Sequence, residues 1–472
     1  MNSAGESFET FTLVRKAKNN IKGWYFYSVA SEPFAVSAVA TYIPLLLEQF
    51  ARINGVSVDD HSIKCTSKHD KCVLGLFNNS VYIDTSSFAL YTFSISVLFQ
   101  TLLVITVSGL VDVWKTVEFK RRVLIFFGVI GSLSLILISQ LEVDQFYALP
   151  FLCIVANSSY GVVNVVGNSL LPVFVSDLIR VDPVQAHIDV DTLTSSVSGA
   201  GASSGYFSAL VVQIISIGLV KKSKSHDNIQ WATLFVGIWW IVWQSPIAWL
   251  LQDIGPTTTG QVLRPVRGEE SAFKLQYLKY GWYSLFKALK HARLLRDVVI
   301  FLVSWFIISD SLTTINSTAI LFSKTELKMS TLSLIIISIL TMLNAILGAY
   351  FIPHYVSPKL KWSAQYTLIY IICWASVIPL YGMLGFYFEN IGLKHQLKCI
   401  LWLCGMVFHL GVYQQFHVQS SVRSFLKGES LLFSVSLALQ TKVHLLLVPF
   451  WLDFSLIKHT ISDTRFTFYS RF

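Results

Sequence analysis

The sequence predicts an all-α polytopic membrane protein with two helical bundles and about 11–12 transmembrane helices. Of the 472 residues, 53% are hydrophobic and only 13% are charged, and the mean hydropathy is +0.58. Soluble globular proteins carry about a quarter charged residues, so this composition places the chain in a membrane. Two of its long apolar stretches contain an acidic residue at a similar depth, which is typical of transporters built from internal repeats.

We assign one membrane span to each long apolar stretch, because a helix needs roughly 20 residues to cross the hydrocarbon core. The fourth stretch is long enough to tilt or break. The tenth is short, and the eleventh is interrupted by Lys442 and His444. The eleven predicted spans are Trp24–Leu47, Phe88–Val111, Val123–Gln140, Phe146–Val175, Ser204–Val220, Trp231–Leu251, Val298–Phe322, Thr331–Ile352, Trp362–Phe388, Cys399–Tyr413 and Leu431–Leu452.

A polar stretch between the sixth and seventh spans divides the chain into two halves of similar size. The second half is incomplete if the eleventh apolar stretch is its last span. The predicted units are a cytosolic N-terminal tail at 1–22, a six-helix bundle at 23–251, a basic cytoplasmic linker at 252–297, a C-terminal bundle at 298–456 and a tail at 457–472.

The distribution of basic residues predicts that the N-terminus is cytosolic. With that orientation, the cytosolic segments hold about twice as many lysines and arginines as the opposite loops, as the positive-inside rule requires. The loop at 48–87 then lies on the other side of the membrane. It contains an N-glycosylation sequon at Asn78 and the pair Cys65 and Cys72, which either form a disulfide or stay reduced.

Two acidic residues lie deep in predicted spans. Counted along the helix, Glu32 lies about 12 Å and Asp310 about 18 Å into its span. A charge near the bilayer midplane costs at least about 3 kcal/mol unless it faces a partner or a wet cavity, so such residues usually mark a pathway. The alternative is a protonated carboxyl that only bonds a neighbouring helix. Pro33 follows Glu32, and we expect it to kink or break the helix beside the carboxylate.

Amides and hydroxyls give two other spans a polar side. Asn157, Asn164 and Asn168 follow steps of seven and four and therefore share one face of the fourth span. They either line a polar path or form hydrogen bonds between helices, which is at least as common for a single amide. We assign the substrate or proton pathway to Glu32, Asp310, Asn157, Asn164, Asn168, Asn316 and Tyr42.

The loop after the second span resembles the signature loop of the major facilitator superfamily, which implies a gate that pairs an acid with basic residues. The resemblance covers Gly109, Asp112 and the basic residues Arg121 and Arg122, which follow Lys120. The usual second glycine is missing, and the corresponding loop at 348–361 has no aspartate.

The central linker contains a basic amphipathic segment at 272–296, which we expect to lie on the membrane surface or across the cytosolic mouths of the bundles. The sequence predicts no enzyme, because it has no phosphate-binding loop, zinc spacing or serine elbow. It also predicts no cofactor, no metal and no nucleic-acid partner. The glycine-rich stretch 199–205 is explained better by close helix packing or a flexible entry to the fifth span.

Several long motifs resemble the fungal autophagy-related protein 22 family, over a region from about Gly23 to about Arg423. The motifs are Gly23–Tyr25, Ala30–Phe34, Ala40–Ala51, Val81–Tyr91, Val299–Leu302 and Thr318–Phe322. The resemblance implies a twelve-span vacuolar membrane protein of the major facilitator type. It also implies export of leucine and other amino acids to the cytosol after autophagic breakdown. After Arg423, only one weak apolar stretch precedes the polar end Ile457–Phe472.

The sequence therefore predicts a vacuolar amino-acid exporter that works in the lipid bilayer, with amino acids and protons as its partners. The substrate ammonium group is expected at Glu32 or Asp310, and its carboxylate near the asparagines or a helix N-terminus. Two alternatives remain: a major facilitator transporter for another small metabolite, and a non-transporting membrane factor for the breakdown of autophagic bodies.

Overall fold

The computed structural model describes residues 2–58, 61–65, 72–76, 79–114, 116–182, 190–222, 228–254 and 331–360, together with single residues and short stretches within 184–188 and 279–381. In this part of the chain, six helices are long and apolar enough to cross a membrane. They contain most or all of each of the first six predicted spans. The six are Thr10–Ile53, Ser87–Val111, Val117–Ile138, Ala148–Val181, Thr192–Val220 and Ile229–Leu250.

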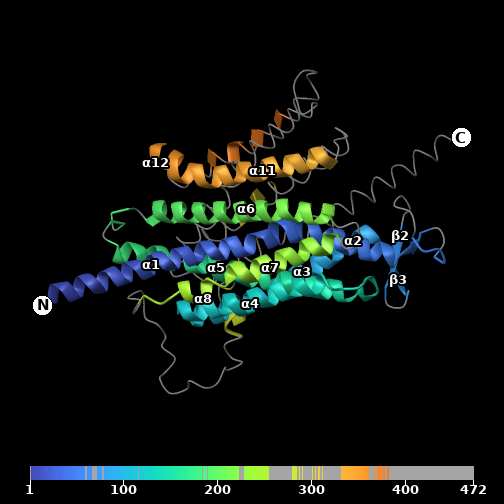
Figure 1. Ribbon diagram of the computed structural model, residues 1–472, viewed down its shortest axis with the longest axis horizontal. Helices are drawn as coiled ribbons and strands as arrows, with labels where there is room; N and C mark the ends of the chain where they lie inside the picture. Colours follow the sequence, from blue (N-terminus) through green and yellow to red (C-terminus); the bar gives the residue numbers. More distant parts are fainter. Residues whose placement is uncertain are drawn as a thin grey trace, which may run out of the picture.

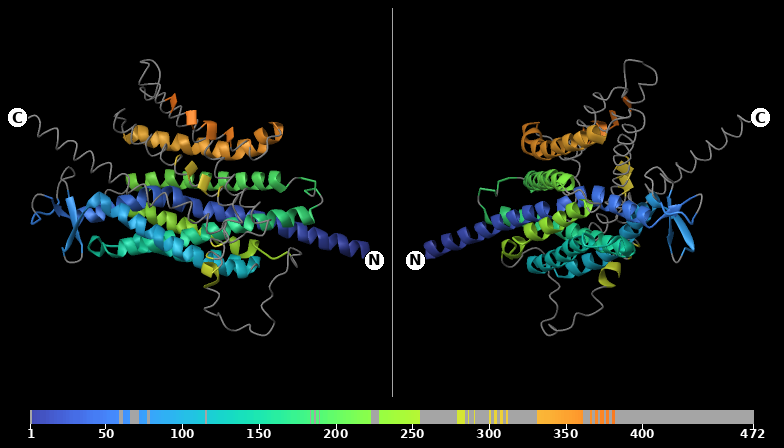
Figure 2. Two further views of the ribbon diagram at one scale, coloured as in Figure 1. Left: turned by 180° about the vertical axis from the view of Figure 1, so that it is seen from behind. Right: turned by 45° about the vertical axis from the view of Figure 1, so that its right-hand side comes forward.

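The long helices run side by side along the longest axis of the molecule (Figures 1 and 2). A small β-sheet lies at the end opposite the N-terminus, and α11 lies beside α6, away from α3 and α4. The elements are α1 (Asn2–Pro33), η1 (Phe34–Tyr42), α2 (Ile43–Ile53), β1 (Val56–Ser57), β2 (Cys72–Leu76), β3 (Val81–Asp84), α3 (Thr85–Val113), α4 (Val117–Ile138), η2 (Val143–Gln145), α5 (Ala148–Val181), α6 (Val190–Lys222), α7 (Asn228–Gln244), α8 (Ile247–Leu250), α11 (Thr331–Phe351), η3 (Ile352–Val356) and α12 (Ser357–Leu360).

The N-terminal segment is helical rather than a polar tail. Helix α1 begins at Asn2, and the side chains of Ala17 and Asn20 are fully buried. Asn20 makes two hydrogen bonds of 2.9 Å with the backbone of Gln252: its Nδ2 donates to the carbonyl, and its Oδ1 accepts from the N–H. Hydropathy missed this region because its buried residues alternate with charged ones on the opposite side of the helix.

The sequence left a kink or a break at Pro33 open, and the first span does not break there. The chain stays helical and changes from α-helix to a nine-residue π-helix, η1. Proline lacks the N–H that would bond the carbonyl of Val29, four residues earlier. That carbonyl instead accepts a 3.0 Å hydrogen bond from Trp239 Nε1 of α7, and it also lies 3.0 Å from Ser208 Oγ of α6, which shares its single proton with the carbonyl of Gly205 at 2.7 Å. The freed backbone group is therefore satisfied by two neighbouring helices and does not line a cavity.

The loop at 48–87 contains a three-stranded antiparallel sheet, which accompanies the predicted helical, polytopic fold. The strands are arranged in the order β1-β2-β3. Cys65 and Cys72 form a disulfide bond, which settles the alternative that the sequence left open. Asn79 adopts a φ of 64° in the turn between β2 and β3, a conformation that asparagine tolerates better than most residues. These strands are short, and their sequences show no clear alternation of polar and apolar residues that would predict them.

The glycine-rich stretch 199–205 lies inside α6 and packs against α1, so the fifth span begins before the predicted Ser204. A Cβ atom on Gly201 would come within 2.1 Å of the Trp24 ring. The indole of Trp24 is held in place by a 3.0 Å hydrogen bond from its Nε1 to the carbonyl of Gly167 in α5. Only glycine allows α6 to approach α1 this closely.

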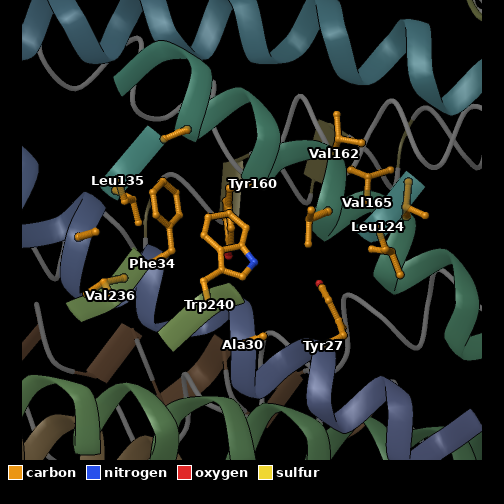
Figure 3. Packing of buried hydrophobic residues seen from close by; sticks show 14 of the residues in the cluster. Tyr27, Ala30, Phe34, Leu124, Leu135, Tyr160, Val162, Val165, Val236 and Trp240 are labelled. Atoms are coloured by element: carbon orange, nitrogen blue, oxygen red, sulfur yellow. The ribbon is translucent and has the colours of Figure 1, made fainter. Parts of the chain in front are cut away.

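A cluster of buried rings forms the centre of the bundle (Figure 3). The ring of Phe34, at the start of η1, lies 5.1 Å from Tyr160 of α5 and 5.1 Å from Trp240 of α7, between ring centroids. Phe34 and Trp240 are fully buried. The cluster joins three helices directly beside the position of Glu32.

Helix α11 follows the polar linker and packs against α6. Ser203 Oγ donates a 2.8 Å hydrogen bond to the carbonyl of Ile346, and Ser196 Oγ lies 2.8 Å from Nε2 of His354 in η3. These contacts connect the part of the chain before the linker with the part after it. The remaining predicted spans lie mostly or wholly outside the described residues.

Candidate functional site

Glu32 lies in the last turn of α1, at a place where α6 leaves room for its side chain. A Cβ atom on Gly205 of α6 would come within 3.2 Å of Glu32 Cβ and 3.3 Å of its Cγ. The carboxylate interacts electrostatically with the phenol groups of Tyr27, Tyr160 and Tyr206, which belong to α1, α5 and α6. Within the described part of the chain, no lysine, arginine or histidine forms an ion pair with Glu32. The site is therefore an acidic group ringed by neutral hydroxyls.

Two of the three predicted asparagines form a row of hydrogen bonds that reaches this site. Asn168 Nδ2 donates to Asn164 Oδ1 at 2.7 Å, and Asn164 Nδ2 donates to the hydroxyl of Tyr160 at 3.3 Å. Tyr27 donates to the backbone carbonyl of Asn164 at 3.4 Å. We call Tyr160, Asn164 and Asn168 the amide row. It runs along α5 from near Glu32 towards the end of the molecule that carries the N-terminus.

Asn157 does not join the amide row. Its side chain is 2% exposed, and its Nδ2 donates a 2.8 Å hydrogen bond to Ser96 Oγ of α3. The face predicted from residue spacing is correct, but a helix face about 16 Å long meets different neighbours at its two ends. At the level of Asn157 the neighbour is α3, so this amide connects two helices.

Tyr42 lies at the end of η1, ten residues after Glu32, and is 8% exposed. Its hydroxyl makes no hydrogen bond within the described part of the chain. The other predicted pathway residues, Asp310 and Asn316, lie outside the described residues. The same is true of Asn78, the predicted glycosylation site.

The residues of the predicted gate loop mostly make contacts near their own end of the bundle. Arg121 Nη1 donates a 2.8 Å hydrogen bond to the carbonyl of Leu251, and Arg122 forms an ion pair with Glu118 one turn earlier in α4. Gly109 allows a close backbone approach, because a Cβ atom there would come within 2.4 Å of Gly281 in the linker. Asp112 lies in the last turn of α3.

Two residues near the gate loop were missed by the sequence-based site assignment. Lys120 is 4% exposed, and its Nζ donates to the carbonyl of Ser169 in α5 at 3.3 Å. Asp253 accepts hydrogen bonds from the N–H groups of Val117 (2.9 Å) and Glu118 (3.4 Å), so it caps the N-terminus of α4. Lys120 looked like one member of an exposed basic run, and Asp253 is too distant in sequence for its capping role to be recognised.

Asp182, just after α5, closes the same end of the bundle. Its Oδ2 forms a 2.9 Å ion pair with Lys18 Nζ of α1, and its Oδ1 accepts a 3.1 Å hydrogen bond from the N–H of Val184. The hydrogen bond from Lys18 holds the pKa of this carboxyl below its usual value. Among the described residues, no three His, Cys, Asp or Glu side chains gather in a way that could hold a metal ion.

The comparisons with known proteins agree on both fold and family. A family model described as "Vacuole effluxer Atg22 like" matches residues 16–414. The chain is 64% identical over 403 residues to autophagy-related protein 22 of Vanderwaltozyma polyspora, covering 84% of this chain and 78% of that protein. It is 51% identical over 488 residues to autophagy-related protein 22 of Saccharomyces cerevisiae (strain S288c), covering 99% and 92%.

Among solved structures, the chain resembles the human organic anion transporter MFSD10 (TETRAN), with a TM-score of 0.60, 11% sequence identity and 92% of each chain covered. It also resembles the proton:xylose symporter XylE of the major facilitator superfamily, with a TM-score of 0.52, 14% identity and coverage of 96% of this chain and 90% of that chain. These similarities show a major facilitator fold. The chain belongs to the Atg22-like vacuole effluxer family, a family of transporters rather than enzymes.

Proposed function

We propose that this protein releases leucine and other neutral amino acids from the vacuole into the cytosol, after autophagic degradation has produced them. The observation that carries the proposal is Glu32, a carboxylate deep in the first span that has no cationic partner among the described residues. Because such a charge is costly in a membrane without a counter-charge, a transient cationic partner explains its presence. The ammonium group of an amino acid, or a proton, supplies that charge.

The proposed orientation places the N-terminus and the gate loop in the cytosol and the β-sheet in the vacuolar lumen. The excess of basic residues at the N-terminal end supports this choice. The disulfide between Cys65 and Cys72 also supports it, because disulfides persist in oxidising compartments and are rare in the cytosol.

In the proposed binding mode, the substrate ammonium group lies against Glu32 and its carboxylate is directed towards the amide row. Glu32 and Tyr160 interact electrostatically, and the row continues to Asn164 and Asn168 with side-chain N–H donors. A neutral side chain then lies among the aromatic and aliphatic side chains of the bundle. Protonation of Glu32 removes the charge that holds the ammonium group, so a proton and an amino acid compete for one carboxylate.

The first test uses vacuoles loaded with labelled leucine, with the protein present, absent or carrying Glu32→Gln. Release is followed at several lumenal pH values. We expect the wild type to accelerate release in a pH-dependent manner, and Glu32→Gln to lose most of this acceleration. The matched control is Glu142→Gln, which neutralises an exposed carboxylate just before η2 and leaves the site unchanged.

Equal release from wild-type and Glu32→Gln vacuoles, at equal protein abundance in the membrane, would contradict the role of Glu32. If a panel of labelled solutes shows that another metabolite is released in place of leucine, the amino-acid assignment is wrong. If no solute is released and autophagic bodies still break down, a non-transporting role replaces it.

A further inference from the structure

The π-helix η1 brings polar residues of the first span onto one face. In a π-helix, the backbone hydrogen bond joins residues five apart, so residues at five-residue steps lie close to one turn apart. This pattern is present here, because the N–H of Ile43 bonds the carbonyl of Ala38. Glu32, Ser37 and Tyr42 follow such five-residue steps. In an α-helix, with 3.6 residues per turn, the same three residues would spread around the helix.

The hydroxyl groups on this face are buried without hydrogen bonds. Ser37 is fully buried and Tyr42 is 8% exposed, and Ser216 of α6 is also fully buried. The hydroxyls of Ser37 and Ser216 are the polar neighbours of the Tyr42 hydroxyl. Nevertheless, none of the three oxygens has a hydrogen-bond partner of good geometry in the part of the chain that the structure describes. Gln213 lies one turn before Ser216, and its Oε1 is likewise buried and unpartnered.

Buried polar groups in proteins are nearly always satisfied, by protein atoms or by ordered water. A buried water needs two to four polar partners, and the neighbouring hydroxyls of Ser37, Tyr42 and Ser216 supply three, with Gln213 one turn away along α6. We call these four residues the polar column. It begins about one turn beyond Glu32 and continues to the end of η1, on the side of the β-sheet.

We propose that the polar column holds ordered water that connects Glu32 with the sheet end of the molecule and carries protons to and from its carboxylate. The proton-carrying role rests on the function proposed above, whereas the bound water does not. A proton leaves the carboxyl group for the adjacent water while another leaves the far end of the column, so no charge accumulates between them. Among the described residues, the titratable groups that interact electrostatically with the carboxylate are the neutral phenols of Tyr27, Tyr160 and Tyr206, and none of these three lies on the sheet side of Glu32 along α1 and η1.

The bound water is tested by X-ray hydroxyl-radical footprinting of the full chain in lipid nanodiscs, since radicals formed from bound water label the side chains next to it. We expect Tyr42 to be labelled several-fold faster than Phe174, which is fully buried in α5. Ser216→Val fills the space with a methyl group and should slow the labelling of Tyr42. Labelling of Tyr42 no faster than that of Phe174 would overturn the proposal, whatever the protein transports.

The proton role is tested in proteoliposomes by two assays of labelled leucine. Ser37→Ala and Ser216→Val should slow uptake driven by a pH gradient several-fold and leave leucine counterflow at equal pH unchanged. The matched control is Ser204→Ala, because the Ser204 hydroxyl bonds the carbonyl of Gly201 within its own helix. Wild-type uptake rates in both variants, with counterflow intact, would refute the proton role. Absence of leucine counterflow in the wild type would instead refute the proposed function, and the footprinting result would still decide whether water is bound.

Discussion

The carbonyl of Val29 shows how a single residue can disturb a helix and be accommodated by its neighbours. Pro33 removes one backbone donor, and the side chains of Ser208 and Trp239 supply two replacements from different helices. A buried carbonyl left without a partner costs about 1–3 kcal/mol. The two side chains therefore protect the first span at the point where it passes from α-helix to π-helix.

This arrangement predicts unequal effects of single and double substitutions. Ser208→Ala and Trp239→Phe each leave one donor on the Val29 carbonyl and should destabilise the protein by about 1 kcal/mol. The double variant removes both donors, so its loss should exceed the sum of the single losses. Thermal unfolding of the purified protein measures the effect, with Thr233→Ala as a control because that hydroxyl bonds the carbonyl of Ile229 in its own helix. Strict additivity would show that the two donors act independently.

At the scale of elements, the packing of α6 on α1 depends on small residues. Gly201 and Gly205 lie one turn apart and receive Trp24 and Glu32. The same face of α6 therefore contacts two residues of α1. One is Trp24, whose ring connects α1 to α5, and the other is Glu32, whose carboxylate we assign to transport. A change in this contact should affect stability and transport together.

Two glycines of the same helix provide a matched comparison. Gly201→Ala places a Cβ atom 2.1 Å from the Trp24 ring and should destabilise the protein by about 1–3 kcal/mol, because that ring is held by its own hydrogen bond. Gly218→Ala meets nothing within 4 Å and should be neutral or stabilising by up to about 1 kcal/mol. Melting temperatures of both variants in the same detergent test this prediction. Equal melting temperatures would show that α6 and α1 can move apart without cost.

Elements differed in how well the sequence predicted them. The first six spans were predicted because hydropathy integrates over about 20 residues and tolerates local errors. Glu32 was selected as a candidate from the sequence because an acidic residue is rare in a membrane-spanning segment, where its charge is costly. The π-helix and the Asp253 cap were not predicted, because each depends on contacts between residues distant in the sequence, and the small sheet was missed because its strands are short and lack a clear alternation. The amide row was predicted in part: spacing placed the asparagines on one face but could not tell which neighbour each would meet.

At the scale of the whole molecule, α6 and α11 connect the parts of the chain on either side of the linker. Major facilitator transporters work by rocking one half against the other around a central site. Ser196 contacts His354, which lies just before α12, and α12 is at the end of the molecule that carries the N-terminus (Figure 1), so this contact should close and open during the cycle. This end is the cytosolic one in the orientation that we propose.

A cross-link between these positions should therefore stop transport. In the double variant Ser196→Cys and His354→Cys, a short bis-thiosulfonate reagent should bridge the two cysteines through cleavable disulfides, and leucine release should fall to the level of vacuoles without the protein. Reduction should restore release, and each single variant should be insensitive to the reagent. Full release from the cross-linked protein would mean that α6 and α11 stay together throughout the cycle.

The contacts of residues 251–253 have a mechanical consequence. Asn20 of α1 holds the backbone of Gln252, Arg121 of α4 holds the carbonyl of Leu251, and Asp253 holds the first turn of α4. The linker to the second half thus begins at residues that are hydrogen-bonded to two helices. A force transmitted through the linker therefore acts on α1 and α4 together and does not separate the end of the sixth span from the bundle. We therefore expect a force on the linker to move α1 and α4 together.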